Sequence, residues 1–258
     1  MTTTTIATTM IPARGSSRNR ILAVTRLHFV NRFAMFGLPS MILGFILLAN
    51  IAIWYLILAA TDPSDPVHHG QGFSYTGAIF YIFIYMMIVA VQAVNRTFPF
   101  ALGYGVTRRN FWLGTSLAFV LLAVLYSVLL TVLSVIELWT NGWGAGGHMF
   151  VPTYFDGGAW YLRFVLYLLV FLLCLFVGSA AAAIYVRWRS TGMIAYFAGL
   201  AIILLGVIAL VTLTGSWVAV GAWLDASGAL GLAAWSLVIS AVSAIAGYFI
   251  LRRATPKN

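Results

Sequence analysis

Charged side chains are scarce in this sequence. Of its 258 residues only 7% are Asp, Glu, Lys or Arg, whereas 62% are hydrophobic. A soluble globular domain carries roughly 25% charged residues, and a chain with so few charges cannot cover a surface that faces water. The scarcity of charge therefore excludes an ordinary soluble domain and indicates a protein whose main solvent is lipid.

Residues that carry chemistry are equally rare. The single Cys174 lies inside an apolar stretch, which excludes an intrachain disulfide and a cysteine metal cluster. The apolar stretches contain almost no acid, His or Lys, the residues that ion-coupled transporters retain inside the membrane. Metalloprotease, Ser-Lys and Walker-type phosphate-binding motifs are also missing. We therefore expect no catalytic residue, no metal site and no cofactor in this chain.

What the sequence has instead is a series of long apolar stretches. A helix needs roughly 20 apolar residues to cross the hydrocarbon core of a bilayer. Six stretches meet this requirement and predict an all-α polytopic membrane protein, with a disordered tail over residues 1–18 and one six-span domain over residues 19–258. The predicted spans are Pro39 to Ala60, Tyr75 to Asn95, Phe111 to Glu137, Trp160 to Val186, Gly192 to Leu213, and Leu232 to Leu251.

The distribution of charge orients these spans. All but one of the 14 Lys and Arg residues lie before the first span, between the second and third, between the fourth and fifth, or after the sixth. All five acids lie on the other side. Because basic residues are retained in the cytoplasm, both termini are predicted to be cytoplasmic. The net charge of +9 does not indicate a nucleic-acid partner, since the basic residues cluster at the ends of apolar stretches rather than on one polar face.

A few polar residues fall within or beside the spans. Glu137 ends the third span and Arg163 begins the fourth, so both are expected at the outer interface, either as partners or as independent interfacial residues. Asn50, near the middle of the first span, is expected to hydrogen-bond across helices or to contact a substrate. Tyr81 and Tyr85 share one face of the second span, where they would contact lipid or the core, or line a translocation path for an amphipathic substrate.

The connection between the second and third spans has the composition of a docking site. Thr97 is a good N-cap, Pro99 fits a first helical turn, and Gly103 and Gly105 would end a helix there, while Thr107 would cap the third span. We expect a short helix across the cytoplasmic mouth whose aromatic side chains fill a groove in a soluble partner, or alternatively lie among lipid headgroups. The candidate docking residues are Thr97, Phe98, Pro99, Phe100, Leu102, Tyr104, Arg108 and Arg109.

Two further segments flank the spans. Asn19 to Phe36 predicts an interfacial helix along the inner leaflet before the first span, since one helical face gathers Leu22, Phe29, Phe33 and Phe36. The connection from Gly215 to Leu230 is too short for two more spans and too apolar for a solvated loop, which predicts a re-entrant or interfacial segment on the outer side. No role is assigned to the Gly- and Trp-rich outer loop over residues 138–158.

These features together resemble the type-2 class of ATP-binding-cassette exporter permeases, in the form of a bacterial half-size membrane subunit. The resemblance rests on the six-span topology, the basic N-terminal arm and the sequence Gly-Val-Thr-Arg-Arg-Asn-Phe-Trp-Leu-Gly-Thr that enters the third span. It implies that residues 97–104 form the coupling helix, which fits a cleft in a nucleotide-binding subunit, and that Arg108 and Arg109 anchor its exit. It also implies a partner ATPase that binds ATP and Mg, and a second permease copy or a paralogue.

The expected function is therefore export across a bacterial cytoplasmic membrane, driven by a separate ATPase subunit. An interior without buried charge suits a hydrophobic or amphipathic substrate such as a drug, an antimicrobial peptide or a lipid. The alternative is a non-transport membrane sensor or assembly protein that uses the same cytoplasmic surface for another partner. The sequence leaves open the substrate, and whether two identical or two different permeases pair.

Overall fold

The computed structural model describes residues 17–62, 73, 76–152 and 158–254, and this part of the chain is helical without a β-strand. The predicted disordered tail, residues 1–18, lies almost entirely outside the described residues. In chain order the elements are α1 (Ser17–His28), the π-helical turn η1 (Phe33–Gly37), α2 (Leu38–Ala60), α3 (Phe80–Gly103), α4 (Arg108–Trp139), the π-helical turn η4 (Gly142–Gly146), α5 (Trp160–Leu213) and α6 (Trp217–Arg252).

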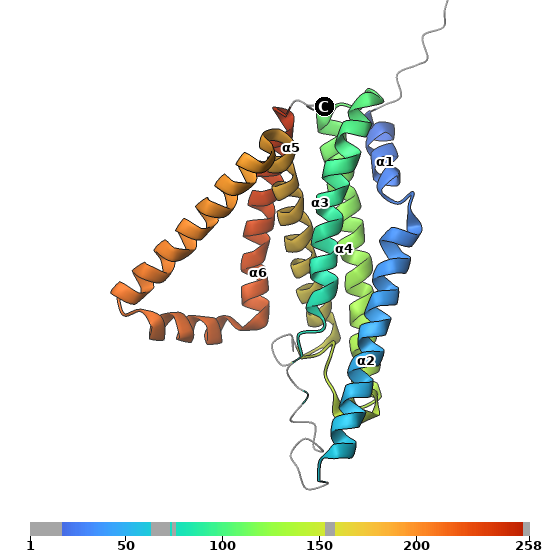
Figure 1. The fold of residues 1–258 in the computed structure, drawn as a ribbon, viewed down its shortest axis with the longest axis vertical. Helices are drawn as coiled ribbons and strands as arrows, with labels where there is room; N and C mark the ends of the chain where they lie inside the picture. The colour runs from blue at the N-terminus through green and yellow to red at the C-terminus, as the bar shows by residue number, and fades with distance from the viewer. Residues whose placement is uncertain (1–16, 63–72, 74–75, 153–157, 255–258) are drawn as a thin grey trace, which may run out of the picture.

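Five helical segments are long and apolar enough to cross a membrane. They are the continuous Phe33–Ala60 stretch, α3, α4, α5 and α6. Helices α2 to α5 run alongside one another, and α1 lies beside the start of α4 (Figure 1). Helix α1 and the last turn of α6 lie at the same end of this bundle, as does the turn between α3 and α4. The fold is that of a multi-pass membrane protein, as the hydropathy pattern predicts.

Helix α5 joins two predicted spans without a loop between them. Its 54 residues would measure roughly 80 Å if straight, far more than the roughly 30 Å of a bilayer core. The backbone breaks at Arg189, where φ is 57° and ψ is −144°. Beyond this residue the helix turns back and diverges from the bundle (Figure 1). The expected connection between the fourth and fifth spans is therefore a break at one residue.

Of the predicted outer segment, residues 215–230, all but the first two residues belong to α6. Gly228 interrupts α6 with φ 59° and ψ −179°, a conformation that glycine adopts without the steric cost of a Cβ. Residues 217–227 lie across the direction of the bundle, and residues 229–252 return along it (Figure 1). The segment is thus one helix set at an angle to the rest of α6.

The N-terminal helix differs from the predicted interfacial helix. Helix α1 ends at His28, and the chain turns before η1 begins at Phe33. Its buried face carries Val24, Thr25 and His28, whereas Leu22 on the expected apolar face is 41% exposed. The predicted length was wrong, because the helix ends at His28, and the prediction did not include the packing of another face of α1 against α4.

Gly114 allows α1 to approach α4 closely. A Cβ at this position would lie 2.6 Å from Val24 Cβ and 2.8 Å from the carbonyl oxygen of Ile21. Thr25 Oγ1 donates to the carbonyl oxygen of Gly114 at 3.0 Å, and His28 Nε2 lies 2.9 Å from the hydroxyl of Thr115. Two buried polar side chains thus fix the register of α1 on α4.

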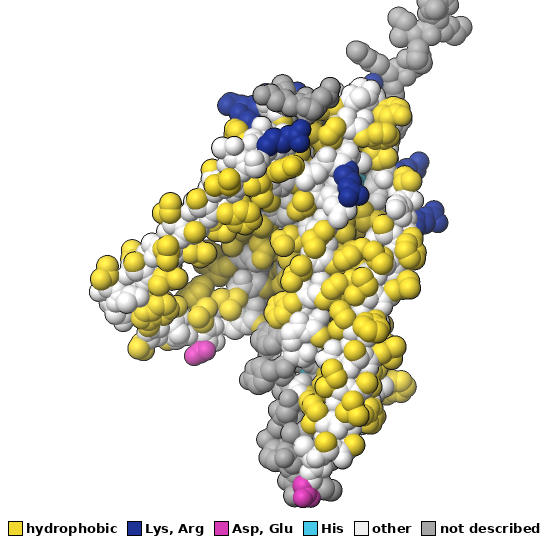
Figure 2. Space-filling view, in the orientation of Figure 1, with side chains coloured by type: hydrophobic (Ala, Val, Ile, Leu, Met, Phe, Trp, Pro, Cys, Tyr) yellow, Lys and Arg dark blue, Asp and Glu magenta, His cyan; other side chains and the backbone are white. Residues whose placement is uncertain are grey.

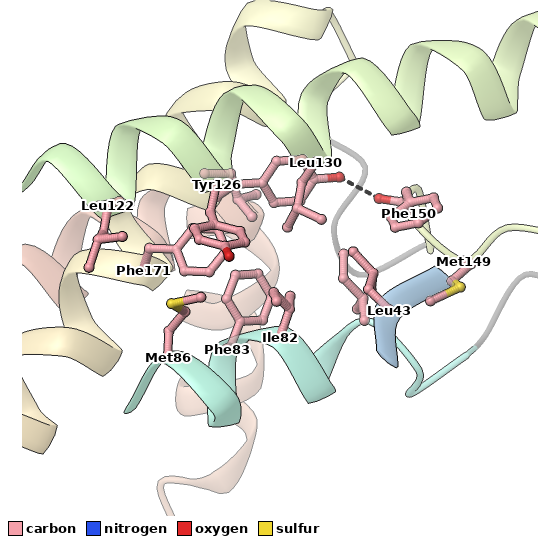
Figure 3. Close-up of a cluster of buried hydrophobic side chains, with 14 of the residues drawn as sticks. Leu43, Ile82, Phe83, Met86, Leu122, Tyr126, Leu130, Met149, Phe150 and Phe171 are labelled. Carbon is pink, nitrogen blue, oxygen red and sulfur yellow. Dashed lines mark hydrogen bonds between the residues drawn. The ribbon is translucent and has the colours of Figure 1, made fainter. Parts of the chain in front are cut away.

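The buried side chains form two clusters. The larger joins α2, α3, α4 and α5, with the rings of Phe83 and Phe171 in contact at 4.7 Å between centroids (Figure 3). The smaller cluster lies at the end of the bundle where α3 meets α4, and it also includes residues of α1, α5 and α6. Its buried members are Val24, Val94, Phe98, Ala101, Phe111, Trp112, Ala182, Ala183, Leu251 and Ala254.

We predict that the contact between α1 and α4 weakens in acid. Burial lowers the pKa of His28 from 6.5 to about 4. As the pH falls below 6.5, His28 is therefore protonated in the undocked helix before it is protonated in the docked one. The free energy of docking α1 on α4 becomes less favourable by about 1.4 kcal/mol per pH unit, up to roughly 3 kcal/mol near pH 4. Spin labels on Leu22→Cys and Val106→Cys, in a Cys174→Ser background, should show a single distance at pH 7 and a broad distribution below pH 5.

His28→Gln provides the control. Its amide can still bond to Thr115 but does not titrate in this range, so the distance distribution should no longer depend on pH. If the native protein and His28→Gln broaden to the same extent in acid, His28 is not the responsible group.

Candidate docking surface at the basic end of the bundle

The expected short coupling helix is not a separate element. Helix α3 runs without a break through residues 97–103, and Pro99 lies inside it. Thr97 is not an N-cap, because its hydroxyl donates back to the carbonyl oxygen of Ala93 in the preceding turn. The prediction was wrong because Phe98 packs edge-on against Phe111 of α4, at 5.2 Å between ring centroids, and this contact holds the last turns of α3 in line with the span.

The turn that follows α3 is fixed by its own hydrogen bonds. Gly105 has φ 74° and donates its N–H to the carbonyl oxygen of Leu102 at 2.9 Å, while Val106 N–H donates to that of Ala101 at 3.1 Å. This pair of bonds is a Schellman motif, which needs glycine at the left-handed position. Thr107 then caps α4, as predicted, by accepting the N–H of Asn110 at 3.3 Å. The segment between the two helices is therefore a rigid turn.

The candidate docking residues divide into buried and exposed members. Phe98 is fully buried in the smaller cluster and cannot contact a partner, which corrects its predicted role. Phe100 is 52% exposed and Tyr104 is 76% exposed, and their rings lie 4.7 Å apart between centroids. Arg96 and Pro99 share the same exposed side of α3. An aromatic pair next to an arginine is typical of the residues that dominate binding energy at protein interfaces.

The two arginines at the start of α4 have different environments. Arg108 is partly buried, and its Nη1 donates to the carbonyl oxygen of Arg252, the last residue of α6, at 2.8 Å. A cation at a helix C-terminus satisfies an unpaired carbonyl and is favoured by the helix dipole. Arg109 is exposed. Arg108 therefore ties α4 to α6, and Arg109 is the one of the pair that faces outward.

A shallow apolar groove runs between α1 and the end of α3, beside the aromatic pair. Its volume is about 190 Å³. Its floor includes Val24 and Ala101, which are 2% and 3% exposed. Its lining residues are Ala23, Val24, Leu27, Phe100, Ala101, Tyr104 and Val106. The groove could not be read from the sequence, because one of its walls depends on how α1 docks against α4.

This end of the molecule is positively charged. Lys and Arg side chains gather toward the end that carries the α3–α4 turn, and the visible Asp and Glu side chains lie toward the opposite end (Figure 2). In the described part of the chain the acids are Asp62, Glu137 and Asp225, each far along the sequence from this turn. The groove and the aromatic pair therefore lie in a basic environment.

The candidate residues of a substrate path lie elsewhere. Tyr85 and Tyr126 donate their hydroxyls to the carbonyl oxygens of Ala34 and Met35 in η1, at 2.9 and 2.5 Å. The ring of Tyr81 lies 5.8 Å from that of Tyr85, and its buried hydroxyl has no partner among the described residues. Tyr85 thus supplies a donor to a backbone carbonyl oxygen of a π-helical turn. The hydroxyl of Tyr81 stays without a hydrogen-bond partner in the described part of the chain.

Asn50 does not reach across helices within the described structure. Its side-chain amide donates to the carbonyl oxygen of Ile46, one turn earlier in α2, at 2.8 Å. This bond satisfies the amide within its own helix. The structure therefore does not bring Asn50 together with the tyrosines of the predicted path through any hydrogen bond.

Glu137 organises the outer loop to which the sequence assigned no role. Its carboxylate is fully buried and accepts the backbone N–H groups of Met149, Phe150 and Val151 at 2.9 to 3.1 Å. The indole N–H of Trp143 adds a fourth donor at 3.1 Å. Glu137 is therefore a buried structural ligand of the loop, and not a simple interfacial residue.

Arg163, the other charged residue at this end, is 4% exposed. Its Nε has no hydrogen-bond partner among the described residues. Within that part of the chain no ion pair joins it to Glu137, so the predicted partnership between the two is not observed. The Glu137 carboxylate accepts hydrogen bonds from the backbone of the loop instead.

Comparisons with protein-family models, with curated proteins and with solved structures found no significant match to this chain. Its function must therefore be inferred from its own residues.

Removing the Glu137 carboxylate should loosen the outer loop. Glu137→Ala leaves three buried backbone N–H groups without an acceptor, and each costs about 1–3 kcal/mol. We expect a clear fall in the thermal unfolding midpoint of the purified protein and faster proteolysis between residues 140 and 152. Asp225→Asn, which removes an exposed acid, should leave both unchanged. Equal behaviour of the two variants would contradict this role of Glu137.

The two tyrosines of α3 should respond differently to loss of a hydroxyl. Tyr85→Phe leaves the Ala34 carbonyl without its donor and should lower the free energy of unfolding by about 1 kcal/mol. Tyr81→Phe removes a buried hydroxyl that has no described partner, so it should be neutral or slightly stabilising. Thermal unfolding of both variants in the same detergent tests this, and a larger loss for Tyr81→Phe would reverse the assignment.

Proposed function

We propose that this chain is the membrane-spanning permease subunit of an ATP-driven exporter of the type-2 ATP-binding-cassette class. A separate ATPase subunit would bind ATP and Mg and dock at the basic end of the bundle. The observation that carries the proposal is the exposed pair Phe100 and Tyr104 at the end of α3, flanked in the sequence by Arg96 and Arg109. It lies in the same segment to which the sequence resemblance assigns the coupling contact.

The proposal includes six passes through the membrane with both ends in the cytoplasm. Division of α5 at Arg189 would make two passes of one helical element, and residues 229–252 of α6 would make the last. An even number of passes agrees with the position of α1 and the end of α6 at one end of the bundle (Figure 1). The concentration of arginine at that end supports a cytoplasmic location for it.

The bundle interior supports a proposal for the substrate class. In the described residues the buried polar groups of the spans are mostly hydroxyls that donate to carbonyl oxygens of their own helix, as Ser127, Thr131 and Ser240 do. Such an interior offers little to a small charged solute and suits a hydrophobic or amphipathic molecule such as a drug, a peptide or a lipid. A second permease copy or a paralogue would complete the translocation path.

Loss of the exposed aromatic pair should detach the ATPase subunit. The test is purification of the tagged protein from its native membrane in mild detergent, with mass identification of the soluble proteins that accompany it. We expect an ATPase subunit in near-stoichiometric amount with the native protein, and at least a tenfold loss of it with Phe100→Ala combined with Tyr104→Ala, because such residues carry most of an interface's binding energy. Arg109→Glu should weaken the association as well.

The matched control is Trp139→Ala, which removes an 87% exposed aromatic side chain at the opposite end of α4. It should leave the ATPase bound. Recovery of the native protein alone, or with a soluble partner that is not an ATPase, would refute the exporter assignment and favour a membrane sensor or assembly protein. Arg108 is a poor probe of docking by itself, because its replacement also frees the end of α6.

A further inference from the structure

We infer that the groove between α1 and α3 is a receptor for the partner subunit, and that its occupant is an amphipathic segment of that subunit with large apolar side chains flanked by Asp or Glu. The inference rests on the proposed function in naming an ATPase as the protein that carries this segment. It reverses the expected geometry of docking, in which a helix of the permease projects into a cleft of its partner.

Between α3 and α4 the described structure has no separate projecting helix that could insert into a partner. The predicted coupling segment is the end of α3, and Phe98, one of its aromatic residues, is fully buried. The turn after it is closed by the Schellman bonds at Gly105 and Val106. What the surface offers is a concave apolar strip with one wall from α1 and the other from α3. A projecting side chain must therefore come from the other protein.

The groove is built to receive one or two large side chains. Its volume of about 190 Å³ is below the roughly 300–1,000 Å³ of pockets that hold whole small molecules. The floor residues Val24 and Ala101 belong to the smaller buried cluster, and Gly114 holds α1 against α4, so the walls are already in place without a partner. A preformed apolar groove of this kind can bind an amphipathic helix through one or two of the side chains along its apolar face.

The arginines around the groove favour acidic residues beside the apolar side chains of the docked segment. Arg26 lies on α1 one residue before the wall residue Leu27, Arg96 lies one turn before Phe100, and Arg109 follows the turn. All three are exposed, and the described acids Asp62, Glu137 and Asp225 lie far from this turn in the sequence. A segment that carries Asp or Glu beside its apolar side chains complements this rim, whereas a basic segment is repelled.

Anionic lipid is the competing occupant, since the charged residues of α1 are all basic, and the size of the groove argues against it. The groove is short, with seven lining residues from the ends of two helices. A surface of this size fits the side chains of a docked protein better than the length of an acyl chain.

The first experiment measures binding of a defined probe. A fluorescent helical peptide of about 15 residues carries Leu at i, i+3, i+4 and i+7 and Glu on the flanks. A second peptide has Lys in place of every Glu. Each is titrated against the full-length protein in nanodiscs of phosphatidylcholine. We expect saturable binding of the Glu peptide, weakened by salt, and at least tenfold weaker binding of the Lys peptide.

Two variants locate the binding to the groove. Ala23→Phe places a ring in the groove from an exposed wall position and should weaken Glu-peptide binding at least tenfold. Leu22→Phe is the matched control, because Leu22 is the neighbouring exposed residue but does not line the groove. Thermal unfolding should be the same for both variants. Equal weakening by the two variants, or equal affinity for the two peptides, would overturn the inference.

A second measurement separates this inference from the proposed function. In the purification from native membranes, Ala23→Phe should lose the ATPase subunit and Leu22→Phe should keep it. If the ATPase co-purifies with the native protein and with both variants, the exporter proposal stands and the groove is not the receptor. If the Glu peptide binds the groove but no ATPase is recovered, the exporter proposal fails alone. If phosphatidylglycerol in the nanodisc displaces the Glu peptide from the groove, lipid is the occupant and the inference is refuted.

Discussion

The need to satisfy every backbone polar group without water governs this structure. In lipid an unpaired N–H or carbonyl costs several kcal/mol, so a spanning chain must be helical wherever water is absent. At several departures from regular helix a side chain supplies a missing hydrogen-bond partner. Tyr85 and Tyr126 serve the carbonyl groups of the π-helical turn before α2. Glu137 serves three N–H groups of the outer loop, and Arg108 serves the last carbonyl of α6.

The helices and some of their ends could be predicted from the sequence, because hydropathy and capping residues are local features of the chain. Residues 39–60 and 111–137 fall within α2 and α4, and Thr107 caps α4 as its spacing indicates. Pro99 was misleading, because a rule for isolated helices places it at a first turn. The contact of Phe98 with Phe111 decides instead, and it joins residues whose proximity depends on the folded bundle.

For the same reason, only part of the candidate docking surface could be predicted from the sequence. Phe100, Tyr104 and Arg109 could be picked from composition, and they are exposed. The α1 wall of the groove could not, since it depends on Gly114 and on the bonds that Thr25 and its neighbours make across to α4. The small and polar residues of α1 and of the start of α4 could have indicated this contact, but the apolar stripe of α1 favoured an interfacial helix instead. The role of Glu137 could not be predicted either, because the N–H groups that donate to its carboxylate belong to a loop whose sequence has no periodic pattern.

The side chain of Arg108 has a mechanical consequence. It crosses from the α3–α4 turn to the end of α6, and nearby the indole of Trp112 fills the space beside Gly247, where a Cβ would lie 2.4 Å from the ring. The turn and the last stretch of α6 are thus braced as one strut. The braced stretch of α6 extends back to Gly228, where the regular helix is interrupted. The transverse helix, residues 217–227, therefore lies beyond the braced part of α6 and continues into it through that one glycine.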